Sequence, residues 1–313
     1  MNRTASTKSL VCGVLSACGV VLATHAAAAQ LGSVDVGSGP EVIMAPPGSA
    51  AGTVWIANQF DGTVTRLAAG DARLLGTTTV GTRPLGLAFD GIDMWVSDYV
   101  GGSISRLRAS DGAVLSKVSV LGGPSALLSA AGVLWVALRD TNSVAKVRIS
   151  DGVRLGTYKV GSRPTGLAYD GANLWVTNNV ANTVTKLRAS DGLVLGTYAV
   201  ADGPFAAAVD GAEIWVTNFF ANSVTRLRTS DGAILGRYPA GDSPAGIAVV
   251  GNSVWVANSG ANTVVRLNKN TGAVEETHTV GNTPFGLAID GTGNLWVANF
   301  RSNSVSASFL TAQ

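Results

Sequence analysis

The sequence predicts an all-β protein, a seven-bladed β-propeller of four-stranded antiparallel blades. Two observations carry this prediction: a tryptophan-centred motif recurs about every 40 residues, and each unit divides into four short segments suited to strands. The seven tryptophans are Trp55, Trp95, Trp135, Trp175, Trp215, Trp255 and Trp296, with a spacing of 40 residues five times and then 41. A fixed period near 40 is typical of propellers and other repeat architectures.

The fourth unit illustrates the four predicted strands. They are PTGLAYD (164–170), NLWVTN (173–178), TVTKLRA (183–189) and LVLGTYAV (193–200). Asp-Gly pairs at 170–171 and 191–192 suit tight hairpins, because glycine adopts positive φ without steric cost. Nothing outside the N-terminal segment predicts a helix, and the glycine density would break helical repeats. A parallel β-solenoid is less favoured, since its coils are usually shorter and need no hairpin turns.

Prolines mark the start of each first strand. Pro84, Pro124, Pro164, Pro204 and Pro244 precede a tryptophan by 11 residues, Pro284 by 12 and Pro40 by 15. Small residues stand two places after six of them: Gly86, Ala126, Gly166, Ala206, Gly246 and Gly286. Innermost strands crowd around a propeller axis, so we expect these strands to line the centre and the tryptophans to fill the space between blades.

The two ends of the chain complement each other. The last unit stops at Gln313 without a fourth strand, while GSVDVGSGP (32–40) aligns with GTYAVADGP (196–204), a fourth strand and its following loop. We therefore expect the N-terminal strand to complete the last blade, which closes the ring and leaves no open edge.

Residues 1–29 have the features of a secretory signal peptide. Arg3 and Lys8 precede an apolar run, and Ala27 and Ala29 give the small-x-small pattern before a cut. We expect cleavage between Ala29 and Gln30, a propeller over 30–313, and a secreted or periplasmic location. The segment LSAC also fits a lipoprotein box, which would instead leave Cys18 lipidated.

Removal of this segment changes the composition. Both cysteines, Cys12 and Cys18, lie within it, and the loss of Arg3 and Lys8 leaves 20 basic and 20 acidic residues. A neutral chain has no electrostatic footprint for nucleic acid. No other stretch is long and apolar enough to span a membrane. We expect a monomer that binds a protein, glycan or small-molecule ligand.

The motifs IWVTN, LWVTN, VWVAN, LWVAN and VWIAN, followed by N-[ST]-V or G-T-V and later by VG-x-x-P-x-G-L-A, resemble the YVTN-type seven-bladed propeller repeat. The resemblance covers nearly all of the chain after residue 29 and implies an exported surface or periplasmic propeller. The repeat is also similar to that of the streptogramin (virginiamycin B) lyases, which implies a metal ion and a catalytic histidine on one face. This sequence departs from them there: His25 lies in the signal segment and His278 in a predicted outer strand.

Oxygen-bearing residues recur in the loops of the upper face, where the first strands begin and the second strands end. Asp202, Asp242 and Asn282 stand two places before successive prolines, and Glu41 follows Pro40 in the next blade around the ring. Such ligands suit Ca²⁺ or Mg²⁺. Asp and Asn are also ordinary turn formers, and that alternative is favoured.

Aromatic and basic residues occupy the same face. The predicted ligand or partner face consists of Phe205, Phe219, Phe220, Phe285 and Phe300, and of Arg83 and Arg163 for an anionic ligand. Phe60, Tyr99 and the irregular pair Arg139 and Asp140 lie on that face as well. Loop aromatics mark recognition surfaces, although packing between blades is an equal alternative.

Two repeated sets are interpreted as structural. Amides that close the second strands (Asn58, Asn178, Asn218, Asn258 and Asn299) suit Asx turns. Third-strand cations (Arg66, Arg106, Lys146, Lys186, Arg226 and Arg266) are expected to pair with turn aspartates (Asp90, Asp170, Asp210 and Asp290) or to face solvent.

No nucleophile motif with a histidine base is present. The sequence thus favours an exported, non-catalytic binding or interaction scaffold. The alternative is a metal-dependent lyase or hydrolase, in which a buried carboxyl of raised pKa would replace the missing histidine.

Overall fold

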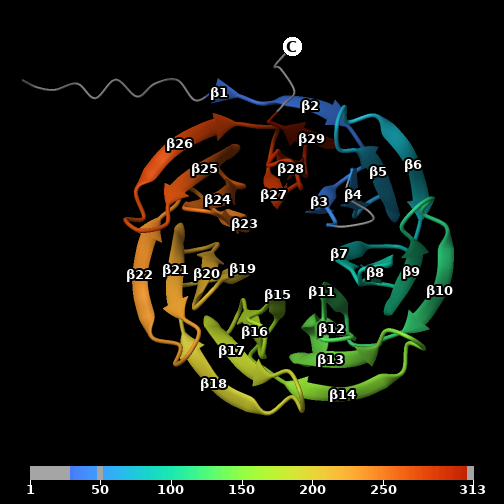
Figure 1. Cartoon of the computed structure of the whole chain (residues 1–313), viewed down its shortest axis with the longest axis horizontal. Helices are drawn as coiled ribbons and strands as arrows, with labels where there is room; N and C mark the ends of the chain where they lie inside the picture. Colours follow the sequence, from blue (N-terminus) through green and yellow to red (C-terminus); the bar gives the residue numbers. More distant parts are fainter. Residues whose placement is uncertain (1–28, 48–51, 309–313) are drawn as a thin grey trace, which may run out of the picture.

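A computed structural model describes residues 29–47 and 52–308, which form seven β-sheets arranged radially around a central axis (Figure 1). The predicted seven-bladed propeller of four-stranded antiparallel blades is confirmed. In the fourth unit the observed strands begin and end within one residue of the predicted ones.

The strands are numbered along the chain, and each blade runs from the innermost strand to the outermost. Blades 1 to 3 contain β3 (Pro40–Met44), β4 (Thr53–Asn58), β5 (Thr63–Ala68) and β6 (Leu74–Thr79); β7 (Pro84–Phe89), β8 (Asp93–Asp98), β9 (Ser103–Arg108) and β10 (Val114–Ser119); and β11 (Pro124–Ala130), β12 (Val133–Leu138), β13 (Ser143–Arg148) and β14 (Arg154–Lys159). Blades 4 and 5 contain β15 (Pro164–Tyr169), β16 (Asn173–Asn178), β17 (Thr183–Arg188) and β18 (Val194–Ala199); and β19 (Pro204–Asp210), β20 (Glu213–Asn218), β21 (Ser223–Arg228) and β22 (Ile234–Pro239). Blade 6 contains β23 (Pro244–Val250), β24 (Ser253–Asn258), β25 (Thr263–Asn268) and β26 (Val274–Thr279), and blade 7 contains β27 (Pro284–Ile289), β28 (Leu295–Asn299), β29 (Ser304–Ala307) and β2 (Gly32–Asp35).

The ring closes as the sequence predicts. Strand β2 pairs antiparallel with β29, with Val34 opposite Val305, so the N-terminal segment supplies the outer strand of blade 7. A short strand that the sequence did not predict, β1 (Ala29–Gln30), pairs in parallel with β26 as a fifth strand of blade 6. The signal segment before Ala29, with both cysteines and the lipoprotein box, lies outside the described residues.

Small residues allow the inner strands to converge. A Cβ atom on Gly86 would collide with the backbone oxygen of Ser125 in blade 3, and one on Gly246 would collide with that of Phe285 in blade 7. Glycine at these positions therefore lets neighbouring blades approach around the channel, which confirms the reason expected from the sequence.

The tryptophans fill the space between blades. Trp55 of blade 1 lies in a buried cluster with Leu87 and Met94 of blade 2, and five others are equally buried. Trp255 is the exception and stays partly exposed. A tyrosine of the outer strand packs on the indole in blades 3 to 5, with ring centroids 5.6–5.9 Å apart, whereas blade 6 has His278 at that place, 5.9 Å from Trp255.

Four of the six third-strand cations join their blade to the next, namely Arg66, Lys146, Lys186 and Arg226. Arg66 donates to the carbonyl oxygen of Ser110 at 3.0 Å, and Lys146 donates to that of Ala189 at 2.8 Å. Both acceptors lie in the outer turn of the following blade. The cation also lies over the tryptophan of its own blade, as Arg66 does over Trp55 at 5.4 Å. One side chain thus contacts two blades at once.

The expected pairing of these cations with the four turn aspartates is wrong, because no such pair forms among the described residues. Three of these aspartates accept indole N–H groups instead, in the pairs Asp90–Trp95, Asp170–Trp175 and Asp290–Trp296. Asp210 instead forms an ion pair with Lys269, which follows the third strand of blade 6 and is not one of these cations. The indole donor is buried beside the turn, and a buried donor needs an acceptor.

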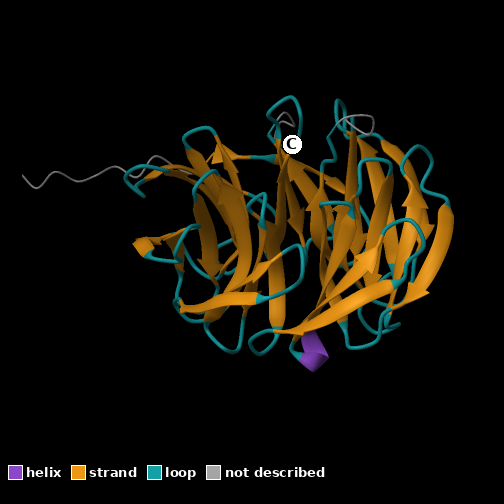
Figure 2. Cartoon of the chain, turned by 60° about the horizontal axis from the view of Figure 1, so that its bottom comes forward, coloured by secondary structure: helices purple, strands orange, loops and turns teal. Residues whose placement is uncertain are grey.

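Helical structure is almost absent from the described residues, as expected, with one correction. The chain from Arg139 to Thr141 forms a single 3₁₀ turn, η2, and Asn142 ends it in the left-handed conformation with φ 51°. Figure 2 shows this turn in purple at the face where the second strands end, the upper face, which lies at the bottom of that view. Within the described residues, no helix has the length and hydropathy needed to cross a membrane.

Candidate functional site: the upper mouth of the channel

One backbone hydrogen bond recurs in all seven blades at the upper face. The residue after each second strand donates its N–H to the carbonyl of the residue before the proline, at 2.8–3.0 Å: Gln59 to Gly39, Tyr99 to Arg83, Arg139 to Gly123, Asn179 to Arg163, Phe219 to Gly203, Ser259 to Ser243, and Phe300 to Thr283. The backbone of the mouth is therefore a uniform frame. The side chains that it carries toward the channel differ from blade to blade.

Blades 2 to 4 give the mouth a cationic side. The guanidinium of Arg83 lies over the ring of Tyr99, 5.5 Å from its centroid, and the Tyr99 hydroxyl donates to Asp140 at 2.8 Å. Arg139, at the start of η2, is the part of this irregular turn that reaches the channel. Arg163 completes the group from blade 4.

Local backbone interactions hold these arginines in place. The Asp98 carboxylate accepts the backbone N–H of Arg83 at 3.0 Å, and the Asn142 side chain accepts that of Arg163 at 2.9 Å. Arg163 has φ 56°, a left-handed conformation that a side chain such as Asn142 helps to hold. The backbone from which both arginine side chains extend is thus held in place.

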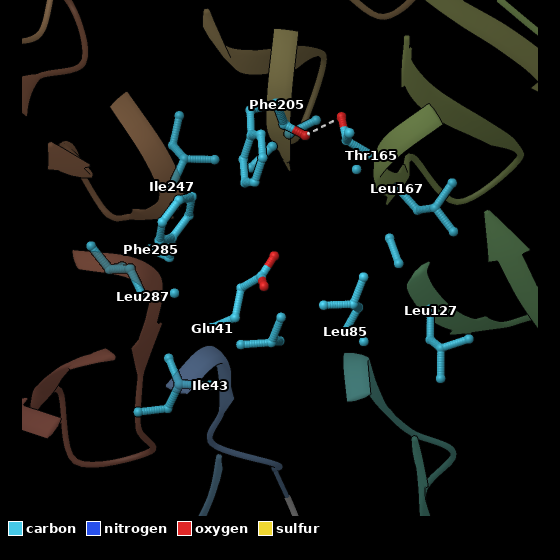
Figure 3. Close-up of a pocket in the computed structure, with 18 of the residues that line it drawn as sticks. Glu41, Ile43, Leu85, Leu127, Thr165, Leu167, Phe205, Ile247, Phe285 and Leu287 are labelled. Atoms are coloured by element: carbon cyan, nitrogen blue, oxygen red, sulfur yellow. Dashed lines mark hydrogen bonds between the residues drawn. The ribbon is translucent and has the colours of Figure 1, made fainter. Parts of the chain in front are cut away.

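Glu41 projects from β3 into the channel, and Figure 3 shows its carboxyl group pointing toward the open centre. Burial raises the pKa of Glu41, although the nearby charges of Arg139 and Arg83 and a hydrogen bond from Gln59 act in the opposite direction. Desolvation disfavours the charged form of an acid, so Glu41 takes up a proton at a higher pH than an exposed glutamate.

Arg139 has the complementary surroundings. Burial lowers the pKa of Arg139; Glu41 offsets part of this effect, while Arg163 and Arg83 add to it. An arginine still stays protonated at physiological pH, so the mouth keeps its positive charges.

Blades 5, 7 and 1 give the mouth an aromatic side. Phe205 and Phe285 are in contact with ring centroids 5.8 Å apart, and both point into the channel in Figure 3. Phe285 contacts Phe300 at 5.5 Å, and Phe300 contacts Phe60 at 5.2 Å. Phe219 contacts Phe205 at a ring-centroid distance of 5.8 Å, and these phenylalanines together form an aromatic belt. Contacts of this kind stabilise a cluster beyond the area that it buries.

Blade 6 leaves room for this belt. At the two positions that carry phenylalanine in blades 5 and 7, blade 6 has Ala245 and Ser259. Phe219 and Phe285 therefore meet across blade 6, with nearly parallel rings 6.3 Å apart. The outer members of the belt stay open to solvent: Phe220 is 68% exposed and Phe60 is 64% exposed.

Two connected cavities follow from this arrangement. The mouth cavity, about 210 Å³, lies between the three arginines, Gln59, Asn179 and the phenylalanines. A deeper channel cavity of about 200 Å³ is lined by aliphatic side chains such as Leu127, Leu167 and Leu287, labelled in Figure 3. Both are lined by Glu41, Arg139, Thr165, Phe205 and Phe285. Their combined volume lies in the lower part of the range typical of small-molecule sites, about 300–1,000 Å³.

The predicted metal arc is dispersed. Asp202, Asp242 and Asn282 are exposed on the rim, whereas Glu41 lies inside the channel. Asp202 accepts from the Asn182 side chain at 3.1 Å, and Asp242 accepts from Ser243 at 3.0 Å, as turn residues do. Within the described residues, no group of three or more His, Cys, Asp and Glu side chains could hold a metal ion. The structure thus places Glu41 apart from the three rim residues, and Ca²⁺ or Mg²⁺ binding stays a prediction.

The amides that close the second strands are structural, but not as Asx turns. The Asn58 and Asn178 side chains are fully buried and donate to third-strand hydroxyls, as Asn178 does to Thr185 at 2.9 Å. This bond fixes the second strand to the third. These buried amides line neither the mouth cavity nor the channel cavity.

Five of the seven residues of the predicted ligand face line the same cavity, and their role in binding stays a prediction. The structure brings Phe205, Phe285, Phe300, Arg83 and Arg163 to one cavity. Phe219 and Phe220 lie beside it in the belt. The sequence did not single out Gln59, Thr165 or Asn179 as mouth residues. Their signal was available, because each stands where another blade of the repeat carries an aromatic or charged side chain.

No family model and no curated protein matches the sequence. The structure is similar to a solved streptogramin B lyase, with a TM-score of 0.77 and 19% identity over 89% of this chain and 96% of that one. Virginiamycin B lyase from Staphylococcus aureus gives a TM-score of 0.77 and 20% identity over 89% and 98%. Kuenenia stuttgartiensis hydrazine synthase gives 0.76 and 19% over 94% and 99%. These likenesses establish the propeller fold.

Proposed function

We propose that this protein is a non-catalytic binding scaffold that holds its ligand at the upper mouth of the channel. One observation carries the proposal: a backbone frame that is the same in all seven blades presents different side chains in each. Framework positions such as the tryptophans repeat because every blade needs them to pack. Packing does not require an arginine, a tyrosine and two phenylalanines at one equivalent position, whereas recognition does.

The proposal includes an exported protein of the YVTN-repeat type. The basic, apolar and small-residue order of residues 1–29 supports export. An exposed rim with Phe60 and Phe220 supports contact with a further molecule, since large exposed aromatics are typical of recognition surfaces. Export is testable by N-terminal sequencing of the protein after secretion, which should begin at Gln30.

A lyase or hydrolase is the second candidate, and Glu41 is the observation that favours it. A carboxyl group with a raised pKa beside arginines has the properties of a general acid or base. Histidine chemistry has no support among the described residues, because His278 packs on Trp255 in an outer blade edge. The binding scaffold is preferred because the arc of acidic residues does not converge on Glu41.

The binding proposal is tested by screening small molecules and oligosaccharides with differential scanning fluorimetry. The test variant carries Phe60→Ala and Phe220→Ala, two exposed rim side chains whose loss should not affect folding. The control is Ile92→Ala, which removes a side chain that is 70% exposed in a turn at the opposite face. Stabilisation that falls in the rim variant and persists in the control supports the mouth as the site. Equal responses in both would contradict it.

The enzyme candidate is tested by the same melts in chelator, Ca²⁺ and Mg²⁺. A stabilisation by either cation that disappears in Asp242→Ala would revive the metal arc, and lactone and ester substrates would then be screened. If Glu41→Gln also abolished turnover of a substrate found in that way, the scaffold proposal would be overturned.

A further inference from the structure

The mouth arginines have no acceptor among the described residues. The Nε atoms of Arg83 and Arg139 are buried without a hydrogen-bond partner, and neither these two side chains nor Arg163 forms an ion pair there. Each guanidinium carries five N–H donors. A buried donor that stays unsatisfied destabilises the fold, so such a group needs an acceptor from outside the chain.

The mouth has one more basic side chain than it has acidic side chains. Three arginines, Arg83, Arg139 and Arg163, face two acidic groups, Glu41 and Asp140. Asp140 already accepts a hydrogen bond from the Tyr99 hydroxyl at 2.8 Å. One positive charge therefore remains when both acids are ionised. A single carboxylate would balance it and would suit the fork of a guanidinium.

The rest of the cavity is apolar. Phe205 and Phe285 form the wall opposite the arginines, and the floor opens into the aliphatic channel beside Leu127 and Leu167. A small inorganic anion would leave these surfaces exposed to water. A molecule with an apolar body would cover them and gain the free energy of that burial.

We propose that the ligand of this mouth is an amphipathic monoanion: a carboxylate joined to an aromatic or branched aliphatic body. The carboxylate accepts hydrogen bonds from Arg83, Arg139 and Arg163, and the body lies against Phe205 and Phe285 or enters the channel. This inference rests on the proposed function and names the ligand class of that site.

The test is isothermal titration calorimetry of the purified protein with four probes at up to millimolar concentration. 4-Phenylbutyrate has both features, 4-phenylbutyramide lacks the charge, butyrate lacks the ring, and phenyl phosphate carries a different anion. Phenylbutyrate should bind at least about tenfold more tightly than the amide and than butyrate, since each loses one set of contacts. It should also bind more tightly than phenyl phosphate.

Variants assign the binding to the mouth. Arg139→Gln should weaken phenylbutyrate about tenfold and leave the amide unchanged. Arg163→Gln should act in the same direction, and because this side chain is exposed its removal does not endanger folding. Phe285→Leu should reduce the advantage of phenylbutyrate over butyrate. Arg237→Gln, on the exposed outer strand β22, is the matched control and should change nothing.

The outcomes separate this inference from the proposed function. If the amide binds as tightly as the acid, if phenyl phosphate binds most tightly, or if none of the probes binds, the ligand class is overturned. The mouth would still be a binding site if hits of the library screen respond to the rim variant. A library without any rim-dependent hit would overturn the proposed function itself.

Discussion

Arg226, in the third strand of blade 5, and Arg139, at the mouth in blade 3, differ in what surrounds their guanidinium groups. Arg226 pairs with Glu213, donates to the carbonyl of Lys269 at 3.3 Å and lies over Trp215 at 5.3 Å. Hydrogen bonding to Glu213 raises the pKa of Arg226. Arg139 has a buried Nε without an acceptor, and burial lowers its pKa.

This difference distinguishes residues that hold the blades of a repeat protein together from residues that stay available to a ligand. A cation stands at the Arg226 position in six consecutive blades, and where it bridges to the next blade it satisfies needs that every blade shares. Arg139 replaces residues as different as Gln59 and Phe219 at its position. The framework cation Arg226 is therefore satisfied inside the fold, whereas Arg139 is unsatisfied at a position where the repeat varies.

The largest expected effect is on the framework side. Arg226→Met removes the ion pair with Glu213 and the link to the next blade, and it leaves a partly buried carboxylate without a cation. We expect the free energy of unfolding to fall by about 3 kcal/mol. Urea unfolding followed by tryptophan fluorescence measures this change. Arg237→Met in the same blade should change it by less than about 0.5 kcal/mol, and similar losses in both would remove the distinction.

A second contrast concerns two aspartates. Asp290 accepts from Trp296 at 2.9 Å and Thr292 at 2.6 Å, whereas Asp242 lies exposed on the rim. Burial alone would raise the pKa of Asp290, but the hydrogen bonds from Thr292, Trp296 and the Asn294 backbone overcome it and hold the pKa at about 2. We expect Asp290→Asn to lower the free energy of unfolding by about 2 kcal/mol, and Asp242→Asn to leave it nearly unchanged.

The pH dependence of that contribution has a definite sign. The folded pKa of Asp290 lies below the ordinary aspartate value of 3.8, so its stabilisation is present above about pH 4 and is lost as the pH falls toward 2. Acid unfolding of the wild type and of Asp290→Asn should therefore converge at low pH. Curves that stayed parallel down to the lowest pH would contradict this assignment.

A smaller effect concerns Glu41 and the anion. Because burial raises the pKa of Glu41, the group takes up a proton at a higher pH than an exposed glutamate, and a negative charge beside Arg139 and Arg83 is then lost. Phenylbutyrate binding should tighten about fivefold as the pH falls through that pKa, until the probe itself takes up a proton. Calorimetry across this range should show a flat profile for Glu41→Gln. An unchanged slope in that variant would exclude Glu41 as the cause.

The fold could be predicted from the sequence because the same physical needs recur in each unit. The positions of Trp175 and Pro164 give the strand pattern, and the segment around Val34 completes the last blade, since an open ring would expose a strand edge. Strand β1 was missed because a two-residue parallel pairing has no sequence signal.

The site could be predicted only in part. Exposed loop aromatics such as Phe285 were identifiable because they interrupt the repeat. The closeness of Glu41 to Arg139, which lies 98 positions further along the chain, depends on how two separate blades aim their side chains across the channel. The equivalent sequence positions of Asp202 and Asp242 predicted a shared site. Sequence position does not show that Asp202 accepts a hydrogen bond from Asn182 and that Asp242 accepts one from Ser243.

The central claim is that the mouth arginines are kept for a ligand and not for the fold. The most direct measurement is the melting temperature of a variant with Arg83→Gln, Arg139→Gln and Arg163→Gln in a Glu41→Gln background, so that Glu41 is not left unbalanced, compared with Glu41→Gln alone. Because the change removes crowded like charges, we expect an equal or higher melting temperature. A fall of more than about 5 °C would show that these arginines hold the propeller together and would contradict the account.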